Sequence, residues 1–375
     1  MWSSSAEGST RRLIQLCAWY FSFYVVTGIS VKYFLGSPAR GLPGMDGVQF
    51  LLFSTLGGNA ICLSVVLATR WYRLRSNGHI TALGVSFPRE YLYIIPSGIC
   101  TAVVIPTTTL MYTLPISVMV AMVIMRGSII VISRLIDAVQ IRQGILKRKV
   151  YAEENWAVGF ALLAVGASLL PVPLAPWFER HAGVAHALGI DPSHLKGGFD
   201  FVHNPLAMWV LGAYIVSYAI RLYLMNYFKN TRQGPATIDN RGYFALEQIS
   251  ASAVIFAVAF ALWFGVRTWG WADPRVVLAH DAISAPTPAA IASGIPYGLV
   301  AFFSVFLFMF QGRTATFAGL VNRLTSLLAG TVATLLLMWF FHLKPPAVTD
   351  WVSFAFILVA VAFLSRAEIR RTAER

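Results

Sequence analysis

Long apolar segments recur along this chain, separated by short polar clusters, and they limit the folds that it can adopt. A helix needs about 20 apolar residues to cross the roughly 30 Å hydrocarbon core of a bilayer. Of the residues, 57% are hydrophobic and only 12% are charged, so a water-facing surface cannot be built from this composition. The pattern predicts an all-α integral membrane protein with ten transmembrane helices, at residues 13–35, 50–69, 91–112, 115–139, 156–173, 205–228, 243–266, 291–311, 315–341 and 348–365.

One division between the expected spans depends on two prolines. Pro106 and Pro115 supply the breaks between the third and fourth spans, where few other residues intervene. Without a turn at this place the chain would have nine spans and not ten.

Basic residues are distributed unevenly between the two sides of the expected spans. With the N-terminus inside, 19 of the 29 Lys and Arg residues fall in cytoplasmic segments and 6 fall on the opposite side. Because Lys and Arg are retained in cytoplasmic loops, we expect both termini to be cytoplasmic, in an inner or plasma membrane. The net charge of +13 is then a topology signal, and nucleic-acid binding is not expected. The first span is long enough to stay in the membrane, so we expect no cleaved signal peptide.

The longest polar interruption lies near the middle of the chain, at residues 172–204. It leaves five spans on each side, and halves with an odd number of spans insert with opposite orientation, as in inverted-repeat transporters. We therefore expect two inverted five-helix repeats. The expected parts are a cytoplasmic N-terminal tail (1–12), the first repeat (13–173), an extracytoplasmic loop (174–204), the second repeat (205–365) and a cytoplasmic C-terminal tail (366–375).

Four basic residues fall inside the expected spans, and these are the main functional signal. They are Lys32, Arg126, Arg221 and Arg323. A charge at the centre of a membrane helix costs about 2.5 to 3.5 kcal/mol, so such residues usually face a protein interior or a water-filled cavity. Glu247 is the main carboxylate at comparable depth, and one acid cannot neutralise four bases. We expect a cavity with surplus positive charge, suited to a phosphate, a carboxylate or a zwitterion.

Polar side chains close to helix-breaking residues extend this predicted site. Asn59 follows two glycines in the second span, and Gln311 ends the eighth span, which also holds Pro296. Gly294 and Gly298 form a GxxxG spacing, which we interpret as close helix packing. The predicted substrate-binding residues are Lys32, Asn59, Arg126, Gln311, Asn322 and Arg323.

Alternatives remain open for three of these charged residues. Arg126 could pair with a carboxylate that locks helices together, and Lys32 could extend to the membrane surface. Glu247 is the predicted proton-coupling residue, because burial disfavours its charged form and a neighbouring Arg favours it. Its alternative role is a fixed ion pair with Arg221 or Arg241.

We expect no metal and no cofactor. Four histidines lie in the central loop, at His181, His186, His194 and His203. The spacing of these histidines matches no metal-ligand pattern. All three cysteines fall inside expected spans, and we interpret them as apolar packing residues.

Several short motifs resemble those of the drug/metabolite transporter superfamily, and more narrowly its nucleotide-sugar-transporter-like and chloroquine-resistance-transporter-like branches. The fourth span reads Ile124-Met125-Arg126-Gly127-Ser128-Ile129-Ile130, and the first has Val26-Thr27-Gly28 followed by Lys32. The ninth span ends near Trp339 to Lys344, and the last begins near Trp351. One departure is Ala245-Leu246-Glu247-Gln248, where related proteins often have a Gly-x-Glu-Gly type sequence.

The resemblance implies a secondary transporter or exchanger whose central cavity, lined by the fourth and ninth spans, opens alternately to each side. The predicted function is therefore alternating-access transport of a small anionic or zwitterionic metabolite. A flippase for a lipid-linked sugar or polar lipid is the alternative. An enzyme is not expected, because the spans hold almost no paired His, Asp or Glu. The expected partners are a small-molecule substrate and the lipid bilayer, with a coupled proton and a homodimer left open.

Overall fold

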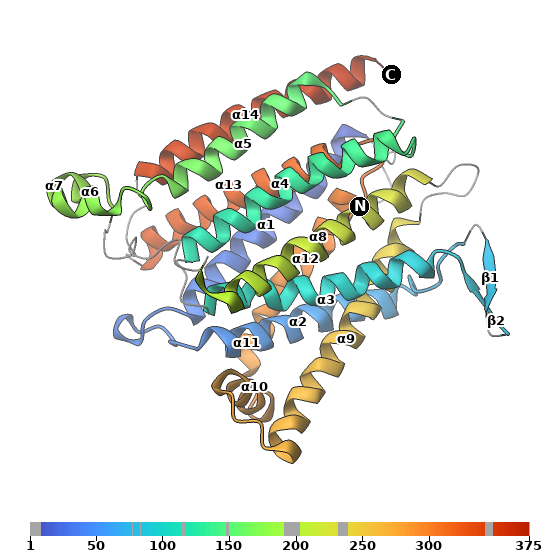
Figure 1. The fold of residues 1–375 in the computed structure, drawn as a ribbon, viewed down its shortest axis with the longest axis horizontal. Coiled ribbons are helices and arrows are strands. Elements are labelled where there is room, and N and C mark those ends of the chain that lie inside the picture. The colour runs from blue at the N-terminus through green and yellow to red at the C-terminus, as the bar shows by residue number, and fades with distance from the viewer. Residues whose placement is uncertain are drawn as a thin grey trace.

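The computed structural model describes residues 9–76, 78–82, 84–113, 118–147, 150–190, 203–231, 239–341 and 348–374. Long helices lie side by side, and both ends of the chain lie toward the same end of the bundle (Figure 1). The helices are α1 (Thr10–Phe34), η1 (Pro38–Arg40), α2 (Gly47–Ala68), α3 (Tyr91–Thr113), α4 (Val118–Arg142), α5 (Ala152–Leu169), α6 (Ala175–Arg180), α7 (Ala182–Ala187), α8 (Pro205–Thr231), α9 (Asn240–Trp269), α10 (Pro274–Ser284), α11 (Pro288–Ala292), α12 (Gly294–Phe308), α13 (Ala315–Phe341) and α14 (Val348–Ala373).

Eight stretches of helix in the described residues are long and apolar enough to cross a membrane. They are α1, α2, residues Tyr91–Thr108 of α3, α8, α9, the α11–α12 stretch Pro288–Phe308, α13 and α14. The prediction of an all-α, multi-pass membrane protein is confirmed. The fourth and fifth expected spans correspond to α4 and α5, which are not among these eight stretches and which carry charged residues. Arg126, Arg134 and Asp137 lie within α4, and α5 begins with Glu153 and Glu154.

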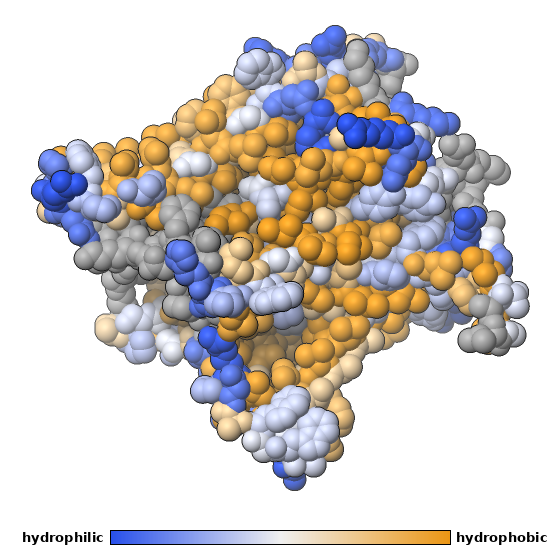
Figure 2. Space-filling view, in the orientation of Figure 1, coloured by the Kyte–Doolittle hydropathy of each residue, from blue (hydrophilic) through white to orange (hydrophobic). Residues whose placement is uncertain are grey.

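The outer surface of the bundle is apolar. Figure 2 shows hydrophobic residues covering the helices, with hydrophilic residues gathered toward the ends. Trp209, Trp339 and Phe340 are 78%, 76% and 70% exposed, which is unusual for side chains of this size in water-soluble proteins. Lipid contact is the physical reason that such a surface is stable.

Two features depart from the expected pattern of spans and loops. A two-stranded antiparallel hairpin, β1 (His79–Ala82) and β2 (Val85–Pro88), joins α2 to α3. Gly84 lies between the strands with φ of 77°, a conformation that glycine adopts without steric cost. The other feature is a break at Ser293, which divides the eighth expected span into α11 and α12.

Glycines allow α2 and α12 to pack closely. A Cβ on Gly294 would overlap the backbone carbonyl of Ser54, and one on Gly298 would overlap the carbonyl of Gly58. No other residue would permit this approach without moving a helix. The packing role predicted for Gly294 and Gly298 is confirmed.

The long helices pack in a defined set of neighbours. α5 lies along α14 at one edge of the bundle, with α4 and α13 beneath them (Figure 1). α1 packs against α12 and α13, and α8 packs against α3 and α4. α3 also packs against α9, and α2 against α12. The interior positions of α1, α4, α8 and α13 therefore surround one central region.

Candidate functional site

Arg323 extends from α13 toward α8 in this central region. Its Nη2 donates a hydrogen bond of 2.6 Å to the hydroxyl oxygen of Tyr218. Its guanidinium carbon lies 5.3 Å from the centroid of the same ring. The Nε atom of Arg323 is buried and has no hydrogen-bond partner among the described residues. Arg323 is therefore held by an aromatic side chain with one donor left unused.

Four tyrosines surround Arg323. Tyr20 and Tyr24 lie one turn apart on α1, and Tyr214 and Tyr218 lie one turn apart on α8. In each pair the ring centroids are 5.6 Å apart. All four interact electrostatically with Arg323. These tyrosines are not among the predicted site residues, although the Tyr-x-x-x-Tyr spacing, which places both rings on one helix face, can be seen in the sequence.

Arg126 of α4 belongs to the same region. It is half-buried and interacts electrostatically with Tyr20, as Arg323 does. Within the described ranges, no ion pair joins Arg126 or Arg323 to a carboxylate. The structure thus brings together the two arginines that the sequence placed in corresponding spans, and the carboxylate partner considered for Arg126 is not found in the described part of the chain.

Glu247 of α9 forms a second polar cluster and is 2% exposed. Its Oε1 lies 2.8 Å from Arg221 Nε, and its Oε2 lies 3.3 Å from Arg221 Nη2. Oε1 also accepts hydrogen bonds from Ser97, at 2.8 Å, and from Thr101, at 3.1 Å. The hydroxyl of Tyr243 donates to Ser97 at 2.8 Å. The carboxylate is therefore fixed by three side chains from α3 and α8.

Arg221 and Arg241 were the two alternative ion-pair partners of Glu247, and the structure contains the pair with Arg221. The other candidate, Arg241, lies with its guanidinium 5.5 Å from the ring of Trp71. Whether Glu247 also couples protons stays a prediction. The guanidinium carbon of Arg221 lies 6.0 Å from the centroid of the Tyr218 ring. Tyr218 therefore stands between Arg323 and the Arg221–Glu247 pair.

Two of the remaining predicted residues take part in helix packing. Asn59 of α2 is buried, and its amide oxygen accepts hydrogen bonds from Gln248, at 2.6 Å, and from Ser252, at 3.0 Å. Its amide nitrogen donates to the carbonyl of Thr55. Asn322 is also buried and donates to Ser304 of α12 at 2.9 Å. Asn322 thus faces α12, whereas its neighbour Arg323 faces Tyr218.

Two others lie away from the arginines and tyrosines. Lys32 is exposed and donates to Thr334 at 2.8 Å. It lies twelve positions after Tyr20 on α1, which is about 18 Å along a helix. Gln311 lies in the turn between α12 and α13, before the first residue of α13. The structure does not bring either side chain to the central region.

A further group of buried charges was not predicted from the sequence. It lies at the end of the bundle where the chain begins and ends. The group comprises Asp137, Glu154, Arg313, Glu368 and Arg371. Four of these residues lie outside the expected spans, because Glu154 and Arg313 fall in short loops between spans and Glu368 and Arg371 fall in the expected C-terminal tail (366–375). Helix α14 in fact continues to Ala373, so Glu368 and Arg371 are carried into the bundle.

Comparisons with known proteins do not identify the chain. No protein-family model matches it. A search of curated proteins finds no match either. The resemblance to the drug/metabolite transporter superfamily therefore rests on the short motifs alone.

Proposed function

We propose that this chain is a secondary transporter or exchanger that moves a small polar metabolite, anionic or zwitterionic, across a membrane by alternating access. Arg126 and Arg323 bind the anionic group of the substrate in the central region. This proposal rests mainly on one observation: two arginines in the interior have no carboxylate partner in the described residues, and they share the tyrosine Tyr20, one of the four that surround Arg323.

Physical chemistry supports an anion as the ligand. A guanidinium removed from water loses hydration, which a phosphate or carboxylate can replace with two parallel, charge-assisted hydrogen bonds. The buried Nε of Arg323 is an unused donor suited to this role. The tyrosine hydroxyls can donate or accept hydrogen bonds to the rest of the substrate.

Helix packing supports the inverted repeat that alternating access requires. With α1, α2, α3, α4 and α5 matched to α8, α9, α12, α13 and α14, neighbouring pairs correspond across the two halves. The pairs α1–α12 and α1–α13 match α8–α3 and α8–α4, and α4–α5 matches α13–α14. Arg126 and Arg323 are each the ninth residue of their helix. The tyrosine pairs lie on the matched helices α1 and α8. The proposal therefore includes ten spans, with both termini cytoplasmic in an inner or plasma membrane.

Proton coupling through Glu247 completes the proposed mechanism. A substrate anion competes with Tyr218 for Arg323, and Tyr218 also contacts Arg221. Movement of Tyr218 then weakens the hold of Arg221 on Glu247. A carboxylate that loses its counter-charge in a dry site takes up a proton, so substrate and proton binding are linked.

The test uses purified protein in proteoliposomes, with sugar phosphates, nucleotide sugars, carboxylates, amino acids, lipid-linked sugars and organic cations as candidate substrates. We expect one class with an anionic group to bind and be transported. Arg323→Gln should weaken its binding about 10- to 100-fold, the equivalent of a charged hydrogen bond of about 1.5–3 kcal/mol. Arg267→Gln is the matched control, since Arg267 is exposed near the end of α9, over Trp263. Transport of organic cations alone, or unchanged anion affinity in Arg323→Gln, would refute the proposal.

A further inference from the structure

The group of buried charges at the terminal end of the bundle joins the two halves of the chain. We call it the terminal cluster: Asp137 of α4, Glu154 of α5, Arg313 before α13, and Glu368 and Arg371 of α14. All five residues are buried. Three carboxylates and two guanidiniums at such depth need close partners, because each unpaired charge would carry a large desolvation cost.

Asp137 and Glu154, from the first half, hold the start of α13. Asp137 accepts hydrogen bonds from the backbone nitrogens of Ala315, at 2.8 Å, and Thr316, at 2.6 Å. A carboxylate at this position satisfies free N–H groups and favours the positive end of the helix dipole. Glu154 accepts a hydrogen bond of 2.9 Å from the hydroxyl of Thr314. The first turn of α13 is therefore bound to α4 and α5 by side chains.

Ion pairs extend this connection to α14. Arg371 pairs with Glu154 across the two halves, and it also lies 3.4 Å from Glu368 on its own helix. Glu368 pairs with Arg313. The ring of Phe317 stands between the two guanidiniums, 5.7 Å from Arg313 and 4.9 Å from Arg371.

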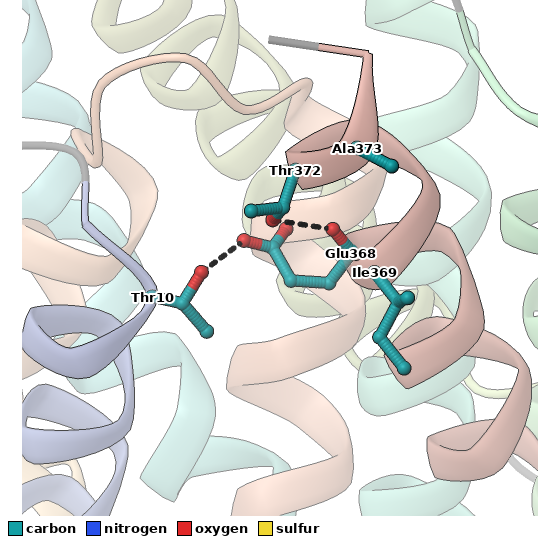
Figure 3. Close-up of a pocket in the computed structure, with 5 residues that line it drawn as sticks. All are labelled: Thr10, Glu368, Ile369, Thr372 and Ala373. Atoms are coloured by element: carbon teal, nitrogen blue, oxygen red, sulfur yellow. Dashed lines mark hydrogen bonds between the residues drawn. The ribbon is translucent and has the colours of Figure 1, made fainter.

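The start of α1 adds one more contact between the halves. The hydroxyl of Thr10 donates a hydrogen bond of 2.9 Å to Glu368, and Figure 3 shows the two side chains meeting from α1 and α14. A crevice lined by Thr10, Glu368, Ile369, Thr372 and Ala373 lies beside this contact. Water in the crevice can reach the edge of the terminal cluster.

The opposite end of the bundle is joined differently. There α1 and α13 meet where Gly28 faces Ala333, and the exposed Lys32 donates to Thr334. These are small or solvent-facing contacts between the same halves. The buried ionic contacts described above lie at the terminal end.

Buried ion pairs are suited to a contact that opens and closes. The attraction within such a pair is largely offset by the desolvation of its two members, so the net free energy of the closed pair is small. If both members become hydrated together, the open state loses little. If only one member is removed, the other is left buried without a counter-charge, which is costly.

We propose that the terminal cluster is the gate that closes the terminal face of the transport pathway, and that it separates between the first half and the α13–α14 side in each cycle. This inference rests on the proposed function, because a gate has a role only if substrate passes. Opening breaks the contacts of Asp137 and Glu154 with α13 and α14 together with that of Thr10 with Glu368. The Arg313–Glu368 pair lies within one half and stays intact.

The test measures exposure of the gate without requiring a substrate. Ala318 is buried and lies one turn after Thr314 on the same face of α13. A cysteine at this position, in a chain whose Cys17, Cys62 and Cys100 are replaced by alanine, reports access to the gate by its rate of labelling with a water-soluble maleimide. The protein is the full chain in lipid nanodiscs.

The main variant is Glu154→Gln/Arg371→Gln. It removes both members of the pair between the halves, so neither is left charged without its partner. We expect labelling at position 318 to become about tenfold faster, equivalent to about 1.4 kcal/mol in favour of the open state. The matched control is Glu153→Gln/Arg370→Gln. It removes the neighbouring pair on the same two helices, at 3.0 Å, in which Arg370 is 51% exposed. Labelling should not change in this control. Equal labelling rates at position 318 in the two double variants would overturn the proposal that the terminal cluster is a gate.

A second variant keeps the test decisive if the main one does not fold. Thr10→Val removes only the hydrogen bond to Glu368 and should speed labelling about threefold. An unchanged rate in a folded Thr10→Val protein would also overturn the proposal. Labelling and transport test the two proposals separately. Faster labelling in a protein that transports no candidate substrate would support the opening of the terminal cluster and refute the proposed function. Active transport with unchanged labelling would support the proposed function and refute the gate.

Discussion

Replacing Glu247 with glutamine tests how strongly the Arg221–Glu247 pair holds the interior together. Glu247→Gln keeps the size of the side chain and removes its charge. Arg221 is buried with this carboxylate at 2.8 Å, so the variant leaves a guanidinium without a counter-charge. Loss of one partner from a buried pair costs about 3–5 kcal/mol. We expect the free energy of unfolding to fall by about 3 kcal/mol, the lower end of this range. The amide oxygen of Gln can still accept the hydrogen bonds from Ser97 and Thr101.

The measurement is the free energy of unfolding of the purified protein in mixed detergent, titrated with dodecyl sulfate. Arg221→Gln and the double variant complete a double-mutant cycle, which isolates the pairwise term. We expect a coupling free energy of about 2 kcal/mol, with the double variant no less stable than Glu247→Gln. Glu153→Gln is the control, because its pair with Arg370 is exposed to solvent and should contribute less than about 1 kcal/mol.

A loss below about 1 kcal/mol for Glu247→Gln would refute this reasoning, because a dry, bonded pair could not then be present. The same variant addresses proton coupling once a substrate is known. Transport driven by a pH gradient should fall in Glu247→Gln. If wild type and variant respond equally to the gradient, Glu247 has only the structural role that its ion pair with Arg221 provides.

Two further predictions concern packing and pH. Gly294→Ala should destabilise the protein by about 1–3 kcal/mol, because its Cβ would overlap the backbone of Ser54, whereas Gly330→Ala on α13 meets open space and should be neutral or slightly stabilising in the same unfolding titration. Tyr151, just before α5, donates a hydrogen bond of 2.6 Å to Glu374, which raises the pKa of its phenol above the ordinary value. This contribution to stability is present below about pH 10 and is lost as pH rises through the folded pKa. In ultraviolet difference titrations against Tyr151→Phe, Glu374→Gln should lower that pKa; an unchanged value would contradict the assignment.

Features that depend on local composition could be predicted well. An apolar stretch of about 20 residues is stable in lipid whatever its neighbours are, so the membrane class of the chain follows directly. Arg126 and Arg323 were recognisable for the same reason, because the cost of a charge at membrane depth depends mainly on its position in the span. Their approach to Tyr20 was not predicted, since it depends on how α1, α4 and α13 pack.

Local features outside the spans were harder to predict. The hairpin of β1 and β2 is short, and its eight paired residues lack a long alternating pattern. The break at Ser293 has no proline at its own position, although Pro296 follows closely. In both places a modest local preference competes with the packing of neighbouring helices.

Partner choice among charged residues was decided only by the tertiary structure. The sequence shows that Glu247 lies deep in its span, but it leaves both Arg221 and Arg241 as candidate partners. Packing of α3 against both α8 and α9 selects Arg221. Arg371 and Glu154 are 217 residues apart and pair because α14 lies along α5. A sequence records the charge of a residue and its depth in a span. The partner of that charge depends on contacts between distant helices, because Coulomb attraction acts through space and not along the chain.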